Sequence, residues 1–326
     1  MTWNLTSSTQ PLNSTTGSGT TISNPVAASK VVIALILLIT FMFGVVVSTP
    51  YLWVLGFRMK KTVNTTWFFH LILAHLAFTF VLPFVIIQLF VSSHWMFDLV
   101  ICKLINSLCA VSMYGAIFFL TVISLDRYMS VFSPHWYRMH MNPHYATIIC
   151  LILWGSAILF STPYLIFQPH PKVNSSAVCD TGYTLPLNWG SQLSQYQVKW
   201  GLFTFRVLLG YILPFVIISF CYFRIAIKMK TGKLARSSKP YKIICVKIVS
   251  FFVCLLPYYI LFGLVIQGDF TQRTMNVMWM LTACFGCFYV CFTPIFYLLS
   301  VVHSFKAFCG NSVLSLMESV FKELSQ

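Results

Sequence analysis

The sequence predicts an all-α membrane protein, a bundle of seven transmembrane helices with a short amphipathic helix after the seventh. Three observations predict this class. The 326 residues are 58% hydrophobic and 8% charged, with a mean hydropathy of +0.81, whereas a soluble domain carries about 25% charged residues. Seven runs of sequence contain no Asp, Glu, Lys or Arg, and a spanning helix needs about 20 such residues. The positive charges between the runs indicate one topology.

The seven uncharged runs are 31–57, 62–97, 104–125, 139–171, 207–223, 248–268 and 274–305. The longest runs include loop residues, and the fifth span continues past Arg206 on one side and Arg224 on the other. Prolines within the runs are compatible with spanning helices because neighbouring helices can satisfy the freed backbone groups. We therefore expect a tail over 1–30, a seven-helix domain over 31–302, and an amphipathic helix with the C-terminal tail over 303–326.

The distribution of Lys and Arg predicts that the N-terminus lies outside the cell. The segment between the fifth and sixth spans carries eight of them: Arg224, Lys228, Lys230, Lys233, Arg236, Lys239, Lys242 and Lys247. Arg58, Lys60 and Lys61 follow the first span, against a lone Lys30 before it. Both segments fall on the same side of a seven-span protein, and positively charged loops mark the cytoplasm. The net charge of +15 therefore reflects topology, and we expect no nucleic acid partner.

Several residues are candidates for covalent modification. Asn4, Asn13 and Asn174 begin Asn-x-Ser/Thr sequons on the predicted outer face, where glycosylation takes place. Cys102 and Cys179 are the cysteines in segments placed outside, so these two can pair. Cys309 lies in the amphipathic helix, where it is either palmitoylated or a reduced thiol. No pair of Cys-x-x-Cys units is present, so we expect no metal site and no cofactor.

Asp126 and Arg127 stand side by side at the inner end of the third span. Charge at membrane depth is costly and marks a functional site by default. An arginine that pairs with its neighbouring carboxylate in one state and releases it in another makes a two-state element. The alternative is an arginine that only anchors the end of the helix.

Other landmarks accompany Asp126-Arg127-Tyr128, and together they resemble the rhodopsin-like class of G-protein-coupled receptors. They are Cys102 and Cys179, Trp154 in span four, Pro214 and Tyr222 in span five, Cys254 and Pro257 in span six, and Pro294 to Tyr297 in span seven. The resemblance runs from about residue 30 to the tail. It implies a switch made of Asp126, Arg127, Tyr128, Tyr222, Pro257, Pro294 and Tyr297. It also implies a heterotrimeric G protein and arrestin as partners on the inner face.

Shorter segments resemble the chemoattractant receptors within this class. They are Trp53-Val54-Leu55, Arg58 to Thr65, Phe69-His70-Leu71, Leu82-Pro83-Phe84 and Ser133-Pro134-His135-Trp136. That group implies an inhibitory-type G protein. Segments 237–242, 248–254 and 314–321 are most similar to an orphan receptor of the class.

The resemblance also implies where a ligand binds. Cys109 stands where receptors for amines have Asp, so a cationic amine has no counter-ion. Arg206 lies eight residues before Pro214, where chemoattractant receptors often have a basic residue, and its guanidinium can bind a carboxylate with two hydrogen bonds. We expect an anionic peptide terminus or a lipid acid at Arg206, with Tyr114 and Tyr258 beside it. The alternative is an arginine that snorkels to the outer headgroups.

The chain departs from the class in its middle. The residues of the usual sodium pocket are replaced by Ser48, His75, Ala116 and Thr293, and the usual tryptophan of span six by Leu255. Hard cations prefer oxygen ligands, so we expect no sodium site. These changes leave open a receptor that binds ligand but couples weakly, as a decoy does. A transporter or channel is a third hypothesis, but no acidic residue lies in the middle of any span, as a cation relay requires.

Overall fold

The computed structural model describes residues 25–90, 99–166, 192–231 and 239–267, together with a few residues between 274 and 286. Every element with bounds in this part of the chain is helical. The α-helices are α1 (Pro25–Trp53), α2 (Val63–Phe90), α3 (Leu99–Phe132), α4 (Pro134–His140), α5 (Pro143–Ile166), α6 (Gln192–Val207), α7 (Leu213–Thr231) and α8 (Lys239–Gln267), and the π-helical turns are η1 (Val54–Arg58) and η2 (Leu208–Ile212).

Five helices in the described ranges are long and apolar enough to cross a membrane. They are Lys30–Arg58, Val63–Ile87, Val100–Phe132, Pro143–Pro163 and Tyr196–Lys228, and they coincide with the first five predicted spans. The sixth predicted span lies in α8, where Phe252–Leu264 is apolar. The seventh, over 274–305, lies mostly outside the described residues. Its described residues Met280 and Phe285 pack against side chains of the bundle.

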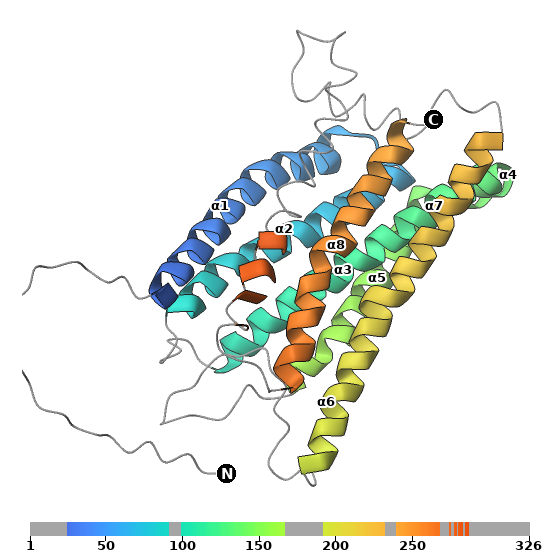
Figure 1. Cartoon of the computed structure of the whole chain (residues 1–326). Helices are drawn as coiled ribbons and strands as arrows, with labels where there is room; N and C mark the ends of the chain where they lie inside the picture. Colours follow the sequence, from blue (N-terminus) through green and yellow to red (C-terminus); the bar gives the residue numbers. More distant parts are fainter. Residues whose placement is uncertain are drawn as a thin grey trace, which may run out of the picture.

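The long helices lie side by side in one bundle, with α3 in its interior (Figure 1). Helix α3 packs against α2, α5 and α7. In the most apolar segment of α3, 61% of the residues are buried inside the protein, whereas in that of α5 only 22% are buried. The short helix α4 lies at one end of the bundle, beside the end of α7 (Figure 1), and we call this the α4 end. A residue on α3 can therefore contact several helices at once.

Proline explains why the fifth span is not one regular α-helix. Pro214 has no backbone N–H to donate to the carbonyl of Gly210, one turn earlier. The π-helical turn η2 ends at Ile212, two residues before Pro214, and joins α6 to α7. Such turns are rare and often occur at functional sites. Pro50 lies on the other side of its π-helical turn, four residues before η1 begins, so each π-helical turn has a proline nearby.

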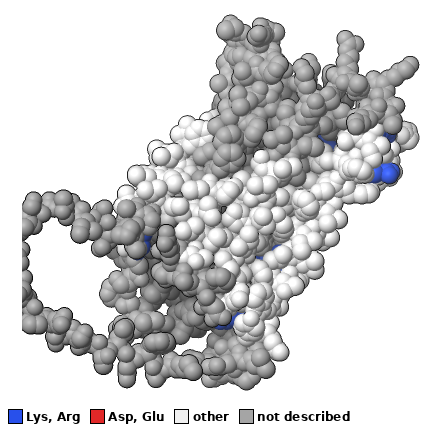
Figure 2. Space-filling model, in the orientation of Figure 1, with Lys and Arg blue, Asp and Glu red and all other residues white. Residues whose placement is uncertain are grey.

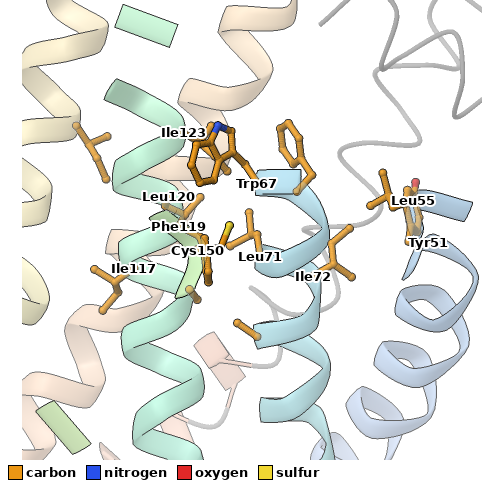
Figure 3. Close-up of a cluster of buried hydrophobic side chains, with 14 of the residues drawn as sticks. Tyr51, Leu55, Trp67, Leu71, Ile72, Ile117, Phe119, Leu120, Ile123 and Cys150 are labelled. Carbon is orange, nitrogen blue, oxygen red and sulfur yellow. The ribbon is translucent and has the colours of Figure 1, made fainter. Parts of the chain in front are cut away.

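The largest core cluster fills the α4 half of the bundle between α1, α2, α3, α5, α7 and α8. It includes Trp67, Leu71, Ile117, Phe119, Leu120, Ile123, Cys150, Ile218, Tyr222 and Phe252. Figure 3 shows Trp67 reaching from α2 toward Leu120 and Ile123 of α3. By contrast, the described outer surface in Figure 2 is almost free of charge, with Lys and Arg mainly near its ends. An apolar face of this kind fits a hydrocarbon environment.

One polar contact lies within this apolar packing. The indole Nε1 of Trp154 on α5 donates to Nδ1 of His70 on α2 across 3.2 Å. The His70 ring stacks on Phe119 of α3 with centroids 5.6 Å apart. The indole also packs on Gly115, where a Cβ atom would lie 3.2 Å from its edge. Because His70 accepts this bond, its Nδ1 carries no proton.

We expect Trp154→Phe to destabilise the protein by about 1–2 kcal/mol. The substitution removes the only donor described for Nδ1 of His70, a partly buried group at the helix contact, and it also removes ring volume. Thermal unfolding of the purified protein in detergent measures the effect. Trp136→Phe, at an exposed position of α4, is the matched control. An unfolding temperature equal to that of the wild type would show that the contact contributes nothing.

Candidate functional site

Asp126, Arg127 and Tyr128 lie in the last two turns of α3, at the α4 end. Asp126 and Arg127 are only 5% and 8% exposed, although charged residues at the end of a helix are usually exposed to solvent. The structure thus places the two predicted switch charges inside the bundle, where each needs a partner.

The Asp126 carboxylate is held by two residues from other elements. Its Oδ1 accepts one hydrogen bond from the indole Nε1 of Trp67 on α2, at 3.1 Å, and one from the hydroxyl of Tyr137 on α4, at 2.7 Å. The Arg127 guanidinium is further away, with Nη2 3.8 Å from Asp126 Oδ2. Its Nη2 donates instead to Oδ1 of Asn64 on α2. The expected Asp126–Arg127 pair is therefore present as a loose ion pair, and the hydrogen bonds go to other residues.

The start of α2 is built to hold Asn64 and Trp67 in place. The backbone N–H of Thr62 donates to the Thr65 hydroxyl at 2.8 Å, and that of Thr65 donates to the Thr62 hydroxyl at 3.2 Å. This reciprocal pair is a capping box with threonine at both positions. It fixes the first turn of α2, so Asn64 and Trp67, one turn apart, both face the end of α3.

The short helix α4 positions Tyr137. Pro134 begins the helix, where its missing N–H is not needed, and the N–H of Tyr137 donates to the Ser133 carbonyl at 2.9 Å. Burial, and then the negative charge of Asp126, raise the pKa of Tyr137 above its ordinary value. The hydroxyl therefore stays protonated and keeps donating to the carboxylate throughout the physiological pH range.

Tyr128 joins α3 to α7 through an aromatic stack. Its ring lies 4.5 Å from that of Phe132 and 6.0 Å from that of Phe220. The ammonium of Lys228 lies 4.6 Å from the Phe132 ring centroid and also donates to the Val131 carbonyl at 2.7 Å. Tyr222 of the same helix is buried in the core cluster. Tyr128 thus packs against α7 through Phe220, whereas Tyr222 packs into the core cluster.

The second predicted site lies in the other half of the bundle, around Arg206 near the end of α6. Arg206 is 3% exposed. Its guanidinium carbon lies 4.8 Å from the ring centroid of Tyr258 and 4.7 Å from that of Phe262, both on α8. Its Nη2 also donates to the Tyr258 hydroxyl. The aromatic faces stabilise the buried positive charge. The headgroup-snorkelling alternative does not describe this side chain, because its guanidinium is enclosed.

The other expected ligand residues lie close to Arg206. Tyr114 of α3 belongs to the same buried cluster as Phe262, over whose ring the guanidinium lies, and Cys109 of α3 lies within electrostatic reach of the guanidinium. Tyr114 is buried and packs near Phe118 and Phe160, with centroids 6.0 Å away in each case. Gly210, in η2, faces the same place: a Cβ atom there would lie 2.7 Å from the Tyr259 hydroxyl and 3.1 Å from the Tyr114 ring.

The residues that replace the usual sodium pocket and the usual span-six tryptophan are buried or partly buried where the structure describes them. Ser48, His75 and Ala116 are buried, and Leu255 is partly buried against the core cluster. Within the described ranges, no group of three or more His, Cys, Asp or Glu side chains could hold a metal ion. Pro257 lies inside α8.

Other predicted residues lie outside the described part of the chain. They are Pro294, Tyr297, Thr293, Cys179, Asn4, Asn13, Asn174 and Cys309. Cys102 is engaged in a disulfide bond.

Trp67, Asn64, Tyr137, Gly210 and Tyr259 did not emerge from the sequence. A tryptophan in an apolar run carries an N–H that needs an acceptor when buried, and this was the one available signal for Trp67. Nothing in the sequence indicates which residues Asn64, Tyr137, Gly210 and Tyr259 contact.

Comparison with known proteins gives one consistent result. Residues 51–297 match the family described as 7 transmembrane receptor (rhodopsin family). The chain is 41% identical to Probable G-protein coupled receptor 33 of Pan troglodytes over 300 residues, covering 91% of this chain and 90% of that protein. It is 36% identical to Chemerin-like receptor 1 of Sus scrofa over 63% of this chain and 59% of that protein. It is 29% identical to the C3a anaphylatoxin chemotactic receptor of Oncorhynchus mykiss over 87% of this chain and 78% of that protein. The predicted resemblances to the class, the chemoattractant group and its orphan member are confirmed, as is the seven-helix fold.

Proposed function

We propose that this chain, which belongs to the rhodopsin family of 7-transmembrane receptors, is a receptor of the chemoattractant type that binds an anionic peptide or lipid and activates an inhibitory-type heterotrimeric G protein. Membership of the family makes it a multi-pass protein of the plasma membrane that binds a ligand and a G protein, and not an enzyme. The ligand class, the type of G protein, the orientation and the binding of arrestin are the proposed parts.

The observation that carries the ligand class is the enclosed guanidinium of Arg206. A charge that is 3% exposed among aromatic rings is costly to bury, and a carboxylate is the partner that its fork of donors fits best. Tyr114, Tyr258 and Cys109 complete the proposed pocket. Two similar proteins are a chemerin-like receptor and an anaphylatoxin chemotactic receptor by name, which supports the chemoattractant type.

The proposed orientation places the α4 end in the cytoplasm and the N-terminus outside. Arg58, Lys60 and Lys61 follow α1 near this end, and Arg224 and Lys228 lie near the end of α7. Such an excess of positive charge marks cytoplasmic segments. Asn4, Asn13 and Asn174 would then be glycosylated outside, Cys102 would pair with Cys179 there, and Cys309 would be open to palmitoylation inside.

In the same orientation, the G protein and arrestin bind at the α4 end. Asp126, Arg127, Tyr128 and Tyr222 are proposed as the switch, together with Pro257, Pro294 and Tyr297. Support comes from the two buried charges, which are bound to residues of α2 and α4. Such contacts can exchange partners when the helices move.

Nucleotide exchange tests the proposal. Membranes containing the chain, mixed with a purified inhibitory-type heterotrimer, should exchange GDP for a GTP analogue faster than membranes without it. Equal rates, both basal and with candidate acidic ligands, would contradict the proposed coupling. Retained ligand binding in that case would favour the decoy hypothesis, for which the aliphatic Leu255 in place of the usual tryptophan is the supporting observation. Solute flux into proteoliposomes tests the transporter alternative.

Trp67→Phe is expected to raise basal nucleotide exchange on the order of fivefold. The substitution removes one of the two donors to Asp126 Oδ1. A hydrogen bond to a charged group contributes about 1.5–3 kcal/mol, and part of this is recovered by water. The conformation that this bond stabilises is therefore less populated in the variant. Trp136→Phe on α4 is the control, and an unchanged basal rate in Trp67→Phe would show that this bond does not restrain the switch.

A further inference from the structure

The Tyr259 hydroxyl is one of the buried polar groups without a described hydrogen-bond partner in the Arg206 half of the bundle, together with the indole Nε1 of Trp200. Tyr259 on α8 is 5% exposed, and its hydroxyl oxygen has no hydrogen-bond partner among the described residues. Buried polar groups in folded proteins are almost always bonded, and each exception needs an explanation.

Neighbouring tyrosines show that an unbonded hydroxyl is not general in this region. Tyr258, the preceding residue, accepts a hydrogen bond from Arg206. Tyr211, whose ring centroid lies 5.3 Å from that of Tyr259, donates to the Phe252 carbonyl at 3.3 Å. The Tyr259 hydroxyl is thus next to bonded tyrosines of the same cluster.

The position of the hydroxyl connects it with Arg206. It points at Gly210, since a Cβ atom there would lie 2.7 Å from its oxygen. Gly210 follows Arg206 by four residues, about one turn further along the same span. The ring of Tyr259 also lies 5.5 Å, centroid to centroid, from that of Tyr258, whose hydroxyl accepts the hydrogen bond from Arg206. The ring of Tyr114 meets the same glycine, at 3.1 Å from the same point. The Tyr259 hydroxyl therefore lies about one helical turn from Arg206 along the span, on the residue next to the tyrosine that Arg206 contacts.

We propose that the Tyr259 hydroxyl is the second anchor of the acidic ligand, donating a hydrogen bond to the carboxylate that Arg206 holds. This inference rests on the proposed acid pocket and narrows its ligands to those with a terminal carboxylate that reaches Gly210. A guanidinium and a phenol O–H together satisfy more of the lone pairs of a carboxylate than Arg206 alone. The cost of leaving the hydroxyl unbonded in the free receptor is recovered on binding. Gly210 contributes by having no side chain where the hydroxyl lies.

The test compares two probes, 4-phenylbutyrate and its uncharged amide, on purified receptor in detergent. Thermal unfolding with increasing probe concentration gives the dissociation constant of each. In the wild type, the acid should bind more tightly than the amide. In Tyr259→Phe, the affinity for the acid should fall about tenfold, while the affinity for the amide should hardly change. The unfolding temperature of the free variant should equal or exceed that of the wild type, because an unbonded buried hydroxyl is removed.

Tyr211→Phe is the matched control, because its hydroxyl is bonded within the protein. That variant should unfold at a lower temperature and keep the wild-type preference for the acid. Gly210→Ala should weaken acid binding as well, and its effect on stability should be smaller when combined with Tyr259→Phe, since the hydroxyl that meets the new methyl group is gone.

The outcomes separate two failures. If the wild type shows no preference for the acid over the amide, the acid pocket itself is wrong. If Arg206→Ala loses the preference but Tyr259→Phe retains it, the pocket stands and the role of Tyr259 is overturned. Lower stability of free Tyr259→Phe with unchanged acid binding would likewise overturn it, because the hydroxyl would then have a partner within the protein.

Discussion

Replacing Arg127 with alanine is expected to abolish agonist-stimulated nucleotide exchange, with a loss of tenfold or more. The guanidinium is buried at the α4 end and contacts both Asp126 and Asn64. In the proposed switch, the guanidinium leaves Asp126 and Asn64 and makes new contacts in the signalling state. Hydrogen bonds to charged groups contribute about 1.5–3 kcal/mol each, so without the guanidinium that state loses on the order of ten- to a hundredfold in population. Stimulated exchange on the reconstituted heterotrimer measures this loss.

Two companion variants make the result specific. Arg138→Ala removes an exposed arginine from α4 at the same end of the bundle and should leave stimulated exchange unchanged. Arg127→Lys keeps the positive charge without the planar fork and should recover only part of the activity. Surface expression separates a signalling defect from misfolding. If stimulated and basal exchange in Arg127→Ala equal those of the wild type, the signalling proposal fails.

Replacing Arg206 with alanine is expected to weaken binding of an acidic ligand on the order of ten- to a hundredfold. The substitution removes a charge-assisted, bidentate interaction of a buried guanidinium with the ligand carboxylate. Such an interaction contributes about 1.5–3 kcal/mol to the free energy of binding. The aromatic rings of Tyr258 and Phe262 would keep their apolar contacts with the rest of the ligand. Competition binding with acid and amide forms of the same ligand measures the effect, and only the acid form should lose affinity.

Lys199→Ala is the matched control for Arg206, because it removes a positive charge from the same helix, α6, two turns earlier. It should change acid binding little, because it alters only the overall electrostatic potential around the receptor, which salt screens. Equal affinity of the wild type and Arg206→Ala for the acid would refute the pocket. Equal losses in both variants would indicate a steering effect without direct contact.

Much of the fold could be predicted because a bilayer imposes a simple requirement. Spanning helices need long uncharged runs, and the runs over 31–57 and 104–125 therefore located α1 and α3 directly. The family match confirms the number of spans. The charged residues in or beside those runs, Arg127 and Arg206, were found for the same reason, since charge at that depth is expensive.

The partners of those charges could not be predicted. Trp67 meets Asp126 only because α2 is rotated to turn that face toward α3, and Tyr137 meets it only because α4 folds back at Pro134. Contacts between helices depend on rotation and relative height, and a sequence does not state either. The sequence suggested that Arg127 and Asp126 bind each other because they are adjacent. Successive residues on a helix do not face each other, which is why their closest oxygen and nitrogen are 3.8 Å apart.

The π-helical turn η2 affects how this span is compared with those of other receptors. A π-helical turn holds more residues than an α-helical one, so it acts as a local insertion that rotates everything before it. Counting eight residues back from Pro214 crosses η2 and ends at a different face than the same count along an unbroken α-helix. Residue numbers in the two halves of the span are therefore comparable only within each half, and a receptor without the turn would present a different residue to the place that Arg206 occupies here.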